Sequence, residues 1–423
     1  MLLSKDATAA AAETGLSSAD FYSPAHGHVY EAITNLVGVG RPTDPVSVAD
    51  ELLRAGLLEA VGGSQALIGL LSSTGAISSA ARYARIILDH AQLRRLIQVG
   101  TELVDLAYEV PGDVEAAIDD AEGRVFALGE RTSSGAVSPI DEVFGRTLDQ
   151  LEAINQKGSG VTGIPTGYRD LDALLGGLHP SALVIIGARP GMGKTALALG
   201  MASHAAKASG RPVLFFSLEM SEFELAQRLL SATARVESER IRRGGLQDRD
   251  WERITAAMAD LGDAPLFLHD DPHLTAQQVV AKARRLKARE GDLGLVVIDY
   301  LQLLTPGRHS AESRQVEVAE MSRALKLAAR ELQAPVVALS QLSRALETRA
   351  DKRPVLSDLR ESGALEHDAD VVAFLYRDEL YHRDSPDRGL AELSVAKHRQ
   401  GPTGEVQLAF ISGHTRFANL AKE

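Results

Sequence analysis

The sequence predicts an α/β protein in which helices cover both faces of a mostly parallel sheet, preceded by an all-helical domain and a linker helix. Two patterns indicate this fold class. From Val161 onward, short apolar runs alternate with helical runs, which is typical of buried parallel strands joined by helices. Residues 1–127 instead carry apolar side chains at helical spacing. We therefore expect a helical interaction domain at 1–127, a linker at 128–160 and an α/β domain at 161–423.

The first domain contains signals for helix boundaries but no set of side chains suited to catalysis. Ser23-Pro24 predicts the N-cap and first turn of a helix that runs toward Gly38. A short helix is expected from Val46 to Leu53, and a long one from Ala80 to Val110. The histidines of this region are isolated along the chain, so we interpret the domain as a surface for interactions.

Two flexible stretches enclose a predicted amphipathic helix. Residues 130–138 are rich in Ser and Gly, and Gly158-Ser-Gly forms a second hinge. Between them, residues 140–156 carry an apolar stripe formed by Val143, Leu148, Leu151 and Ile154. A lone helix with such a stripe needs a surface that covers it. That surface belongs either to the same chain or to a neighbouring subunit.

Charge and composition exclude several classes of protein. The 423 residues carry a net charge of −12, which does not suit a protein that coats nucleic acid, so any contact with DNA must be local. Only 4% of the residues are aromatic, which favours a grip on the DNA backbone over stacking on many bases. No apolar run is long enough to span a membrane, and the absence of cysteine suits a reducing cytoplasm.

Apolar runs predict the strands of the α/β domain at Leu183–Ile186, Val213–Leu218, Leu266–Leu268, Leu293–Ile298, Val336–Leu339, Val371–Leu375, Glu392–Ala396 and Val406–Phe410. Helices are expected between them at Phe223–Ala234, Thr275–Arg289 and Glu317–Gln333. Because parallel strands open their carboxyl ends at one edge of the sheet, polar residues that follow strands are the first candidates for a site.

A glycine-rich loop follows the first of these strands. Gly187-Ala-Arg-Pro-Gly-Met-Gly-Lys-Thr lies between the strand and a helix-forming run that begins at Ala196. This layout is typical of a P-loop, in which successive backbone N–H groups face the phosphates of a nucleotide. Lys194 would face the β- and γ-phosphates, and the Thr195 hydroxyl would bind Mg²⁺. The first glycine of the strict pattern falls at Ala188, so an ordinary strand–helix turn is the alternative.

Three other predicted strands end in polar side chains. Asp299 could hold Mg²⁺ beside the P-loop, or cap a turn. Glu219, expected one strand away from the P-loop strand, could serve as the base for hydrolysis; otherwise it is a carboxylate at a helix N-terminus. Gln341 could sense the γ-phosphate, or be an ordinary polar residue of a loop.

The segment Leu342–Asp370 is long and polar, and it contains no clear strand. Loops of this length are usually functional. Within it, Arg360-Glu-Ser-Gly363 could contact a phosphodiester backbone through a guanidinium and exposed N–H groups. One alternative is a solvated loop. Another is a DNA site on the basic helix around Lys282, Arg285 and Arg289.

Two cations, Lys397 and Arg399, lie two residues apart at the end of a predicted strand, and therefore on the same face. Together they could reach the γ-phosphate of a nucleotide bound by a neighbouring subunit, as arginine fingers do. The alternative is a pair of charges on an edge strand.

The motifs follow one another in an order that resembles a known family. The series consists of Gly187-Ala-Arg-Pro-Gly-Met-Gly-Lys-Thr, Phe216-Ser-Leu-Glu-Met, Ile298-Asp-Tyr-Leu-Gln-Leu, Leu339-Ser-Gln-Leu-Ser-Arg, Ser357-Asp-Leu-Arg-Glu-Ser-Gly-Ala-Leu-Glu-His-Asp-Ala-Asp, Lys397-His-Arg-Gln-Gly-Pro-Thr-Gly and Thr415-Arg-Phe. Asp20-Phe-Tyr-Ser-Pro-Ala-His and Glu59-Ala-Val-Gly-Gly extend it into the first domain. Together they resemble the DnaB-type replicative DNA helicases over nearly the whole chain. Gly191 stands where that family usually has Ser, which only loosens the turn, and we expect a shortened first domain because the family usually begins with an additional helical segment.

The resemblance implies a RecA-like P-loop domain and a homohexameric ring that encircles single-stranded DNA. Such a motor uses ATP and Mg²⁺ to move 5′→3′ and unwind duplex DNA, with a primase and a helicase loader as partners in the cytoplasm. It implies the roles given above for Lys194, Thr195, Glu219, Asp299 and Gln341, and fingers that act in trans at Lys397 and Arg399. The ATP-binding residues would be Arg189, Pro190, Gly191, Met192, Gly193, Lys194, Thr195, Ala196 and Arg228, and the DNA contacts would be Arg360, Glu361 and Gly363.

Two other functions remain open on the sequence. A RecA-like recombinase would form filaments and pair DNA strands rather than unwind duplex. A non-enzymatic adaptor or loader would respond to ATP without a complete hydrolytic set. The helical first domain and the linker helix favour the helicase over the recombinase, and the set of Glu219, Asp299, Lys397 and Arg399 argues against the adaptor.

Overall fold

The computed structural model describes residues 1–2, 4–72, 79–109, 160–305, 314–382 and 384–421, together with scattered positions between 112 and 152. The chain divides into two compact units, Met1–Val143 and Phe144–Glu423. Most of the predicted linker lies outside the described residues, including Leu151 and Ile154, so the boundaries at 128–160 stay a prediction. No helix among the described residues is long and apolar enough to cross a membrane.

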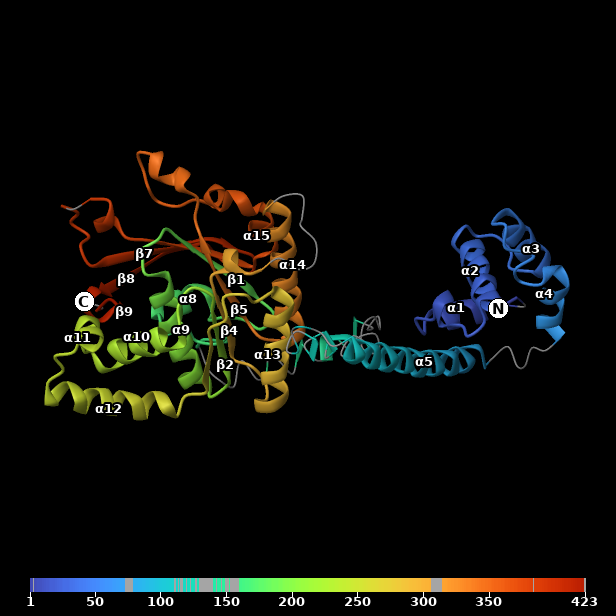
Figure 1. The fold of residues 1–423 in the computed structure, drawn as a ribbon. Coiled ribbons are helices and arrows are strands. Elements are labelled where there is room, and N and C mark those ends of the chain that lie inside the picture. The colour runs from blue at the N-terminus through green and yellow to red at the C-terminus, as the bar shows by residue number, and fades with distance from the viewer. Residues whose placement is uncertain are drawn as a thin grey trace. The chain divides into compact units, whose positions relative to one another are not determined.

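The described part of the first unit is helical, as the spacing of its apolar residues predicts. Its helices are α1 Lys5–Ala12, α2 Pro24–Gly38, α3 Pro45–Arg54, α4 Gly63–Ser72 and α5 Ala80–Tyr108 (Figure 1). Pro24 occupies the first turn of α2, as expected. Asp44 caps α3 by accepting hydrogen bonds from the backbone N–H groups of Val46 and Ser47. The helix ends therefore follow from local capping chemistry.

In the second unit, the described strands form one nine-stranded sheet in the order β3-β2-β4-β5-β1-β6-β7-β8-β9. Neighbouring strands from β3 to β6 pair in parallel, and β7, β8 and β9 continue the sheet with antiparallel pairs. The strands are β1 Leu183–Ala188, β2 Val213–Ser217, β3 Leu266–His269, β4 Leu295–Asp299, β5 Val336–Gln341, β6 Val371–Tyr376, β7 Leu390–His398, β8 Gly404–Ile411 and β9 Arg416–Asn419.

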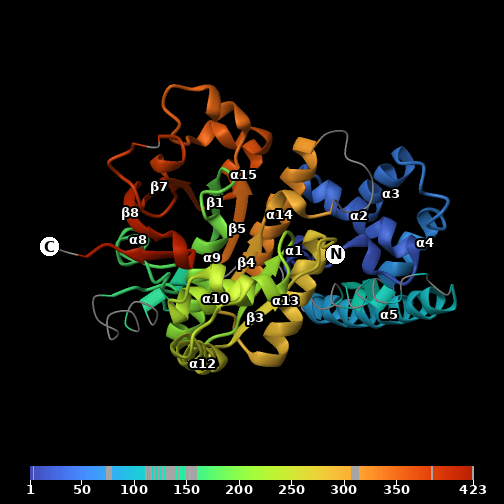
Figure 2. The same ribbon diagram turned by 60° about the vertical axis from the view of Figure 1, so that its left-hand side comes forward.

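Helices cover both faces of this sheet, and each face has its own core. On one face, α8 Arg169–Leu175, α9 Lys194–Ser209 and α10 Glu222–Ala234 pack on the strands. On the other face lie α13 Ala276–Glu290, α14 Arg314–Leu332 and α15 Gly363–Asp368 (Figure 1, Figure 2). The strands β1, β2 and β4 are buried along their whole length because helices cover them on both sides.

Two further helices, α11 Ser238–Arg243 and α12 Asp248–Gly262, follow α10 and precede β3 along the chain. The polar segment after β5 contains no strand in its described backbone. It forms the short helices η4 Arg344–Thr348, η5 Leu356–Ser362 and α15.

The sheet order corrects one expectation about the site. The strand β2, which leads to Glu219, is not one strand away from the P-loop strand β1, because β4 and β5 lie between them. The carboxyl ends of β1, β2, β4 and β5 still share one edge of the sheet, since all four strands are parallel. That edge carries the loop after β1 and the acid that ends β4.

Candidate active site

The glycine-rich loop joins the end of β1 to the first turn of α9. Gly191 and Gly193 adopt φ values of +83° and +98°, which other residues rarely adopt. A Cβ on Gly193 would also lie 2.9 Å from the Phe417 ring, so this position has no room for a side chain. The helix that begins at Lys194 directs its free N–H groups toward the loop, as a phosphate site requires.

Three polar side chains meet at the end of β4. Thr195 donates a hydrogen bond from Oγ1 to Oδ2 of Asp299 over 2.5 Å. Lys194 Nζ lies 3.8 Å from the other carboxylate oxygen, Oδ1, and 4.3 Å from the centre of the Tyr300 ring. The Asp299 side chain is completely buried, and its Oδ1 accepts no hydrogen bond. A buried oxygen without a donor is an available ligand for a cation or for water.

Burial shifts the pKa values of Lys194 and Asp299 in opposite directions. It lowers the pKa of Lys194, although the charges of Asp299 and Glu219 oppose the shift. It raises the pKa of Asp299, although Lys194, the hydrogen bond from Thr195 and the charge of Arg228 oppose that shift. Burial thus disfavours the charged form of both groups, and the opposite charge of each partner favours the charged form of the other.

Glu219 and Gln341, the other two polar residues predicted at strand ends, differ in how they are connected to the residues around this cluster. Glu219 is exposed, and its charge reaches both Lys194 and Tyr300, whose pKa it helps to raise. Gln341 ends β5, and its backbone N–H donates to Oε1 of Gln302 over 3.1 Å. The amide of Gln302 donates in return to the carbonyl oxygen of Gln341 over 3.1 Å. Gln302 therefore fixes the end of β5, a role that we did not predict for it although it belongs to the motif that begins at Ile298.

Arg189 belongs to the loop, but its side chain turns away from the space that the loop encloses. The guanidinium is only 8% exposed and forms an ion pair with Glu347. It also donates from Nη1 to the carbonyl oxygen of Leu342 over 2.8 Å. The prediction that Arg189 contributes to a nucleotide site therefore concerns its backbone, since its side chain is engaged with the segment after β5.

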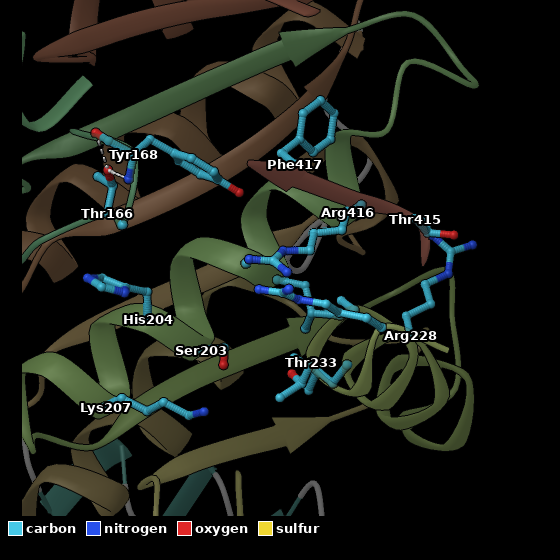
Figure 3. Close-up of a pocket in the computed structure, with 17 residues that line it drawn as sticks. Thr166, Tyr168, Ser203, His204, Lys207, Arg228, Thr233, Thr415, Arg416 and Phe417 are labelled. Atoms are coloured by element: carbon cyan, nitrogen blue, oxygen red, sulfur yellow. Dashed lines mark hydrogen bonds between the residues drawn. The ribbon is translucent and has the colours of Figure 1, made fainter. Parts of the chain in front are cut away.

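A cavity of about 310 Å³ lies along one side of α9, from Ala196 to Lys207 (Figure 3). Its lining includes Ala196 and Arg228, both predicted to bind nucleotide, and the aromatic rings of Tyr168 and Phe417. In Figure 3, Ser203, His204 and Lys207 line the side formed by α9. The structure thus brings Arg228 to the side of α9, close enough for its charge to affect Asp299.

The side chains of Lys397 and Arg399 both reach the C-terminal end of α15, which agrees with the prediction that they lie on the same face. Lys397 donates to the carbonyl oxygens of Glu366 and His367, the latter over 3.3 Å, and Arg399 also donates to the oxygen of His367. These oxygens belong to the last turn of α15, where the helix dipole favours cations. Arg399 further lies 3.6 Å from Asp370. Their contacts within the described part of the chain are with α15 and Asp370 rather than with Lys194 or Asp299.

The predicted DNA-binding residues lie at the junction of two short helices. Arg360 and Glu361 belong to η5, and Gly363 begins α15. Their backbone is described, whereas the side chains of Arg360 and Glu361 lie outside the described part of the chain.

Comparison with known proteins decides the family. Residues 163–419 match the DnaB-like helicase C terminal domain, and residues 1–89 match the DnaB-like helicase N terminal domain. The chain belongs to the DnaB-like helicase family. The replicative DNA helicase DnaB of Leifsonia xyli subsp. xyli is 46% identical over 421 residues, which cover 100% of this chain and 92% of the relative.

Two solved structures agree with the predicted fold class. A DnaB-like replicative helicase, described with its interactions with primase, is 32% identical, covers 98% of both chains and superposes with a TM-score of 0.78. The ATPase domain of G40P is 39% identical, covers 67% of this chain and 100% of its own, with a TM-score of 0.64. The helical first part and the RecA-like second part are therefore confirmed. None of these relatives supports the recombinase or the adaptor, and as a member of the family the chain is a replicative helicase, an ATP-dependent enzyme.

The oxygen atoms of Thr195 and Asp299 at this edge of the sheet are suitable ligands for Mg²⁺. Thr195 Oγ1 and the carboxylate of Asp299 are hard oxygen ligands, and Asp299 Oδ1 is buried without a donor. Two protein oxygens suit Mg²⁺, which usually takes one or two carboxylates and completes its shell with phosphates and water.

Proposed function

We propose that this DnaB-like helicase hydrolyses MgATP at the loop before α9, moves 5′→3′ along single-stranded DNA and unwinds the duplex at a replication fork. The observation that carries the proposal is the cluster of Lys194, Thr195 and Asp299 directly beside a loop shaped for phosphates. The cavity of about 310 Å³ next to Ala196 has the size of a small-molecule site and would take the base and ribose, with Arg228 in its wall.

Each residue of the cluster has a distinct task in this proposal. Lys194 binds the β- and γ-phosphates as a point charge. The backbone N–H groups between Arg189 and Ala196 hold the phosphate chain, except at Pro190, which has no N–H. Thr195 and Asp299 would hold Mg²⁺, which neutralises charge on the phosphate oxygens. Glu219 is exposed at the same edge and orients and deprotonates the attacking water, while Gln341 reports the γ-phosphate to the segment that follows it.

We further propose a homohexameric ring in which one chain completes the site of the next. Lys397 and Arg399 already point together, so a modest movement away from the end of α15 would present both charges to a neighbour's γ-phosphate. The domains 1–127 and 161–423 would be joined by the linker 128–160. Its apolar stripe, of which Leu148 is exposed, would be covered by an adjacent subunit.

Single-stranded DNA would pass along Arg360, Glu361 and Gly363. In a ring these residues repeat around the hole, so a small local charge is multiplied in a protein whose net charge is −12. A primase and a helicase loader would be the protein partners, and the cytoplasm would be the place of action. The primase proposal is supported by the DnaB-like replicative helicase whose structure was described with its interactions with primase.

An unwinding assay combined with ATPase measurements tests the proposal. A helicase separates a forked duplex that carries a 5′ single-stranded tail, and its ATP hydrolysis rises when single-stranded DNA is added. A recombinase would pair strands on the same substrates, and an adaptor would bind ATP with negligible turnover. Unwinding that needs a 3′ tail instead would refute the proposed direction.

A further inference from the structure

The loop that surrounds the proposed phosphate site is tied to the segment after β5 by the Arg189 side chain and by a backbone hydrogen bond, in which the Leu342 N–H donates to the carbonyl oxygen of Ala188 over 3.2 Å. Arg189 donates to Oε1 of Glu347 from Nε over 2.8 Å and from Nη2 over 2.6 Å. Its remaining nitrogen, Nη1, donates over 2.8 Å to the carbonyl oxygen of Leu342. All three nitrogens of the guanidinium are therefore committed to the segment, and none is directed at the proposed phosphate site.

The burial of Arg189 makes this contact a strong one. The guanidinium is 8% exposed and Glu347 is 45% exposed, so the arginine is the partner that depends on the pair. Hydrogen bonds to the carboxylate of Glu347 and to the carbonyl oxygen of Leu342 satisfy the buried guanidinium. If the carboxylate were removed, the buried positive charge would have no negative partner. The loop and η4 are thus held in one fixed relation while the pair is intact.

The segment held by Arg189 leads directly to the proposed DNA contacts. Asp358, which precedes Arg360 by two residues, accepts a hydrogen bond from Arg349 over 2.8 Å, and its carbonyl oxygen accepts one from the Ser343 N–H over 3.2 Å. Asp358 also accepts from the Val355 N–H over 2.8 Å. Asp358 therefore joins η5 to Ser343 and Arg349, which lie on either side of Glu347 in the chain.

Space for such a displacement is present beside the pair. A cavity of about 470 Å³ lies between the segment and the edge of the sheet. Its walls include Arg189, Tyr300, Gln302 and Gln341 on one side, and Ser343 and Asp358 on the other. This cavity leaves room beside the ion pair for the segment to change its position relative to the sheet edge.

We propose that the Arg189–Glu347 ion pair is the positioning contact that makes the segment 342–358 follow the phosphate loop, and so couples bound nucleotide to the grip on single-stranded DNA. The inference rests on the proposed function, because it assumes that ATP binds at the loop and DNA at η5. Coupling between two such sites requires a contiguous contact that both sites bias, and this ion pair lies on that route.

Glu347→Ala and Glu347→Gln in the full chain test this role. Glu347 touches neither proposed ligand, so basal ATP turnover and the KM for ATP stay unchanged in both variants. In Glu347→Ala, stimulation of ATPase by single-stranded DNA falls by about tenfold, which is the scale of an ordinary coupling energy between sites. The difference in single-stranded DNA affinity with and without a non-hydrolysable ATP analogue disappears. Glu347→Gln, which keeps the acceptor oxygen but loses the charge, gives an intermediate effect.

Glu392→Ala is the matched control. Glu392 accepts from Arg353 over 3.0 Å and so anchors the same segment to β7, without contact to the loop. If the pair with Arg189 is the coupling contact, Glu392→Ala keeps the DNA stimulation and the nucleotide-dependent DNA affinity of the wild type.

Two results would overturn the inference. One is a Glu347→Ala protein with normal DNA stimulation and normal nucleotide-dependent DNA affinity. The other is an equal loss in Glu347→Ala and Glu392→Ala, accompanied by a lower melting temperature, which would assign the pair to stability alone. If the wild type itself hydrolyses ATP without responding to single-stranded DNA, the proposed function fails first, and this inference with it.

Discussion

Thr195 and Asp299 lie 104 residues apart in the chain, yet the hydroxyl of one donates to the carboxylate of the other over 2.5 Å. The contact forms because α9 begins and β4 ends at the same edge of the sheet. It holds two oxygen atoms suited to Mg²⁺ beside each other. For MgATP bound as proposed, this arrangement reduces the reorganisation that accompanies binding and so favours tight binding.

Hydrolysis provides the first test of the residue roles. Lys194→Ala removes the only charge that the loop offers to the phosphates, so ATPase activity should be abolished. Glu219→Gln should retain ATP binding and lower turnover by about 10²-fold or more, as expected for a lost general base. Steady-state ATPase and binding of a fluorescent ATP analogue measure both effects. A Glu219→Gln protein with normal turnover would show that another group activates the water.

The pH dependence of nucleotide binding follows from the burial of Lys194. Because burial lowers the pKa of this ammonium, its charge is lost as pH rises through a value below that of an ordinary lysine. Affinity for the ATP analogue, measured without Mg²⁺, should therefore weaken earlier on the alkaline side than ordinary lysine chemistry predicts. Lys194→Arg is the control, since a guanidinium stays protonated and should move this loss of affinity to higher pH. If affinity were lost at the same alkaline pH in both proteins, deprotonation of Lys194 would not be the cause of the loss.

Mixed rings test whether Lys397 and Arg399 act on a neighbour. Arg399→Ala subunits keep an intact phosphate site, and Lys194→Ala subunits keep intact fingers. Mixing them should restore part of the ATPase activity, because some interfaces regain both halves. Inactivity at every mixing ratio, once mixed rings are confirmed by native mass spectrometry, would argue against simple complementation between subunits.

The proposed grip on DNA predicts a specific dependence on salt. Arg360→Ala should weaken binding of single-stranded DNA to a similar degree for all sequences, since a phosphate contact carries no base information. It should also flatten the slope of affinity against salt concentration, because fewer counterions are released on binding. Fluorescence anisotropy across a salt series measures both effects. An unchanged slope would direct attention to the basic helix α13, which carries Lys282, Arg285 and Arg289.

The strands and most helices of the second unit could be predicted because each is an uninterrupted apolar or periodic run. The elements that we did not predict from the sequence are short or polar. The helix α12, Asp248–Gly262, has a largely hydrophilic sequence, and β9, Arg416–Asn419, is only four residues long. Such elements are stabilised by the neighbours on which they pack rather than by their own pattern.

The candidate site divides in the same way. Lys194, Thr195 and Asp299 follow strands or a glycine loop, and the structure brings them together. The partner of Arg189 could not be predicted, because Glu347 lies 158 residues away and its position depends on how the segment after β5 folds. The distance of Glu219 from the P-loop strand was misjudged for a related reason, since sequence order does not determine strand order.

The ring of Phe417 stands against Gly193, and Phe417 in turn contacts Phe410, with 4.8 Å between the ring centres. Arg377 lies over Phe410 and donates to the carbonyl oxygen of Gly191 over 3.3 Å. The wall behind the loop is thus built from residues that a ribosome adds long after the loop itself. We therefore expect a nascent chain to emerge unable to hold nucleotide until β8 and β9 have been synthesised and have closed onto the loop. Prematurely terminated translation products that lack these strands would then not compete with finished subunits for ATP.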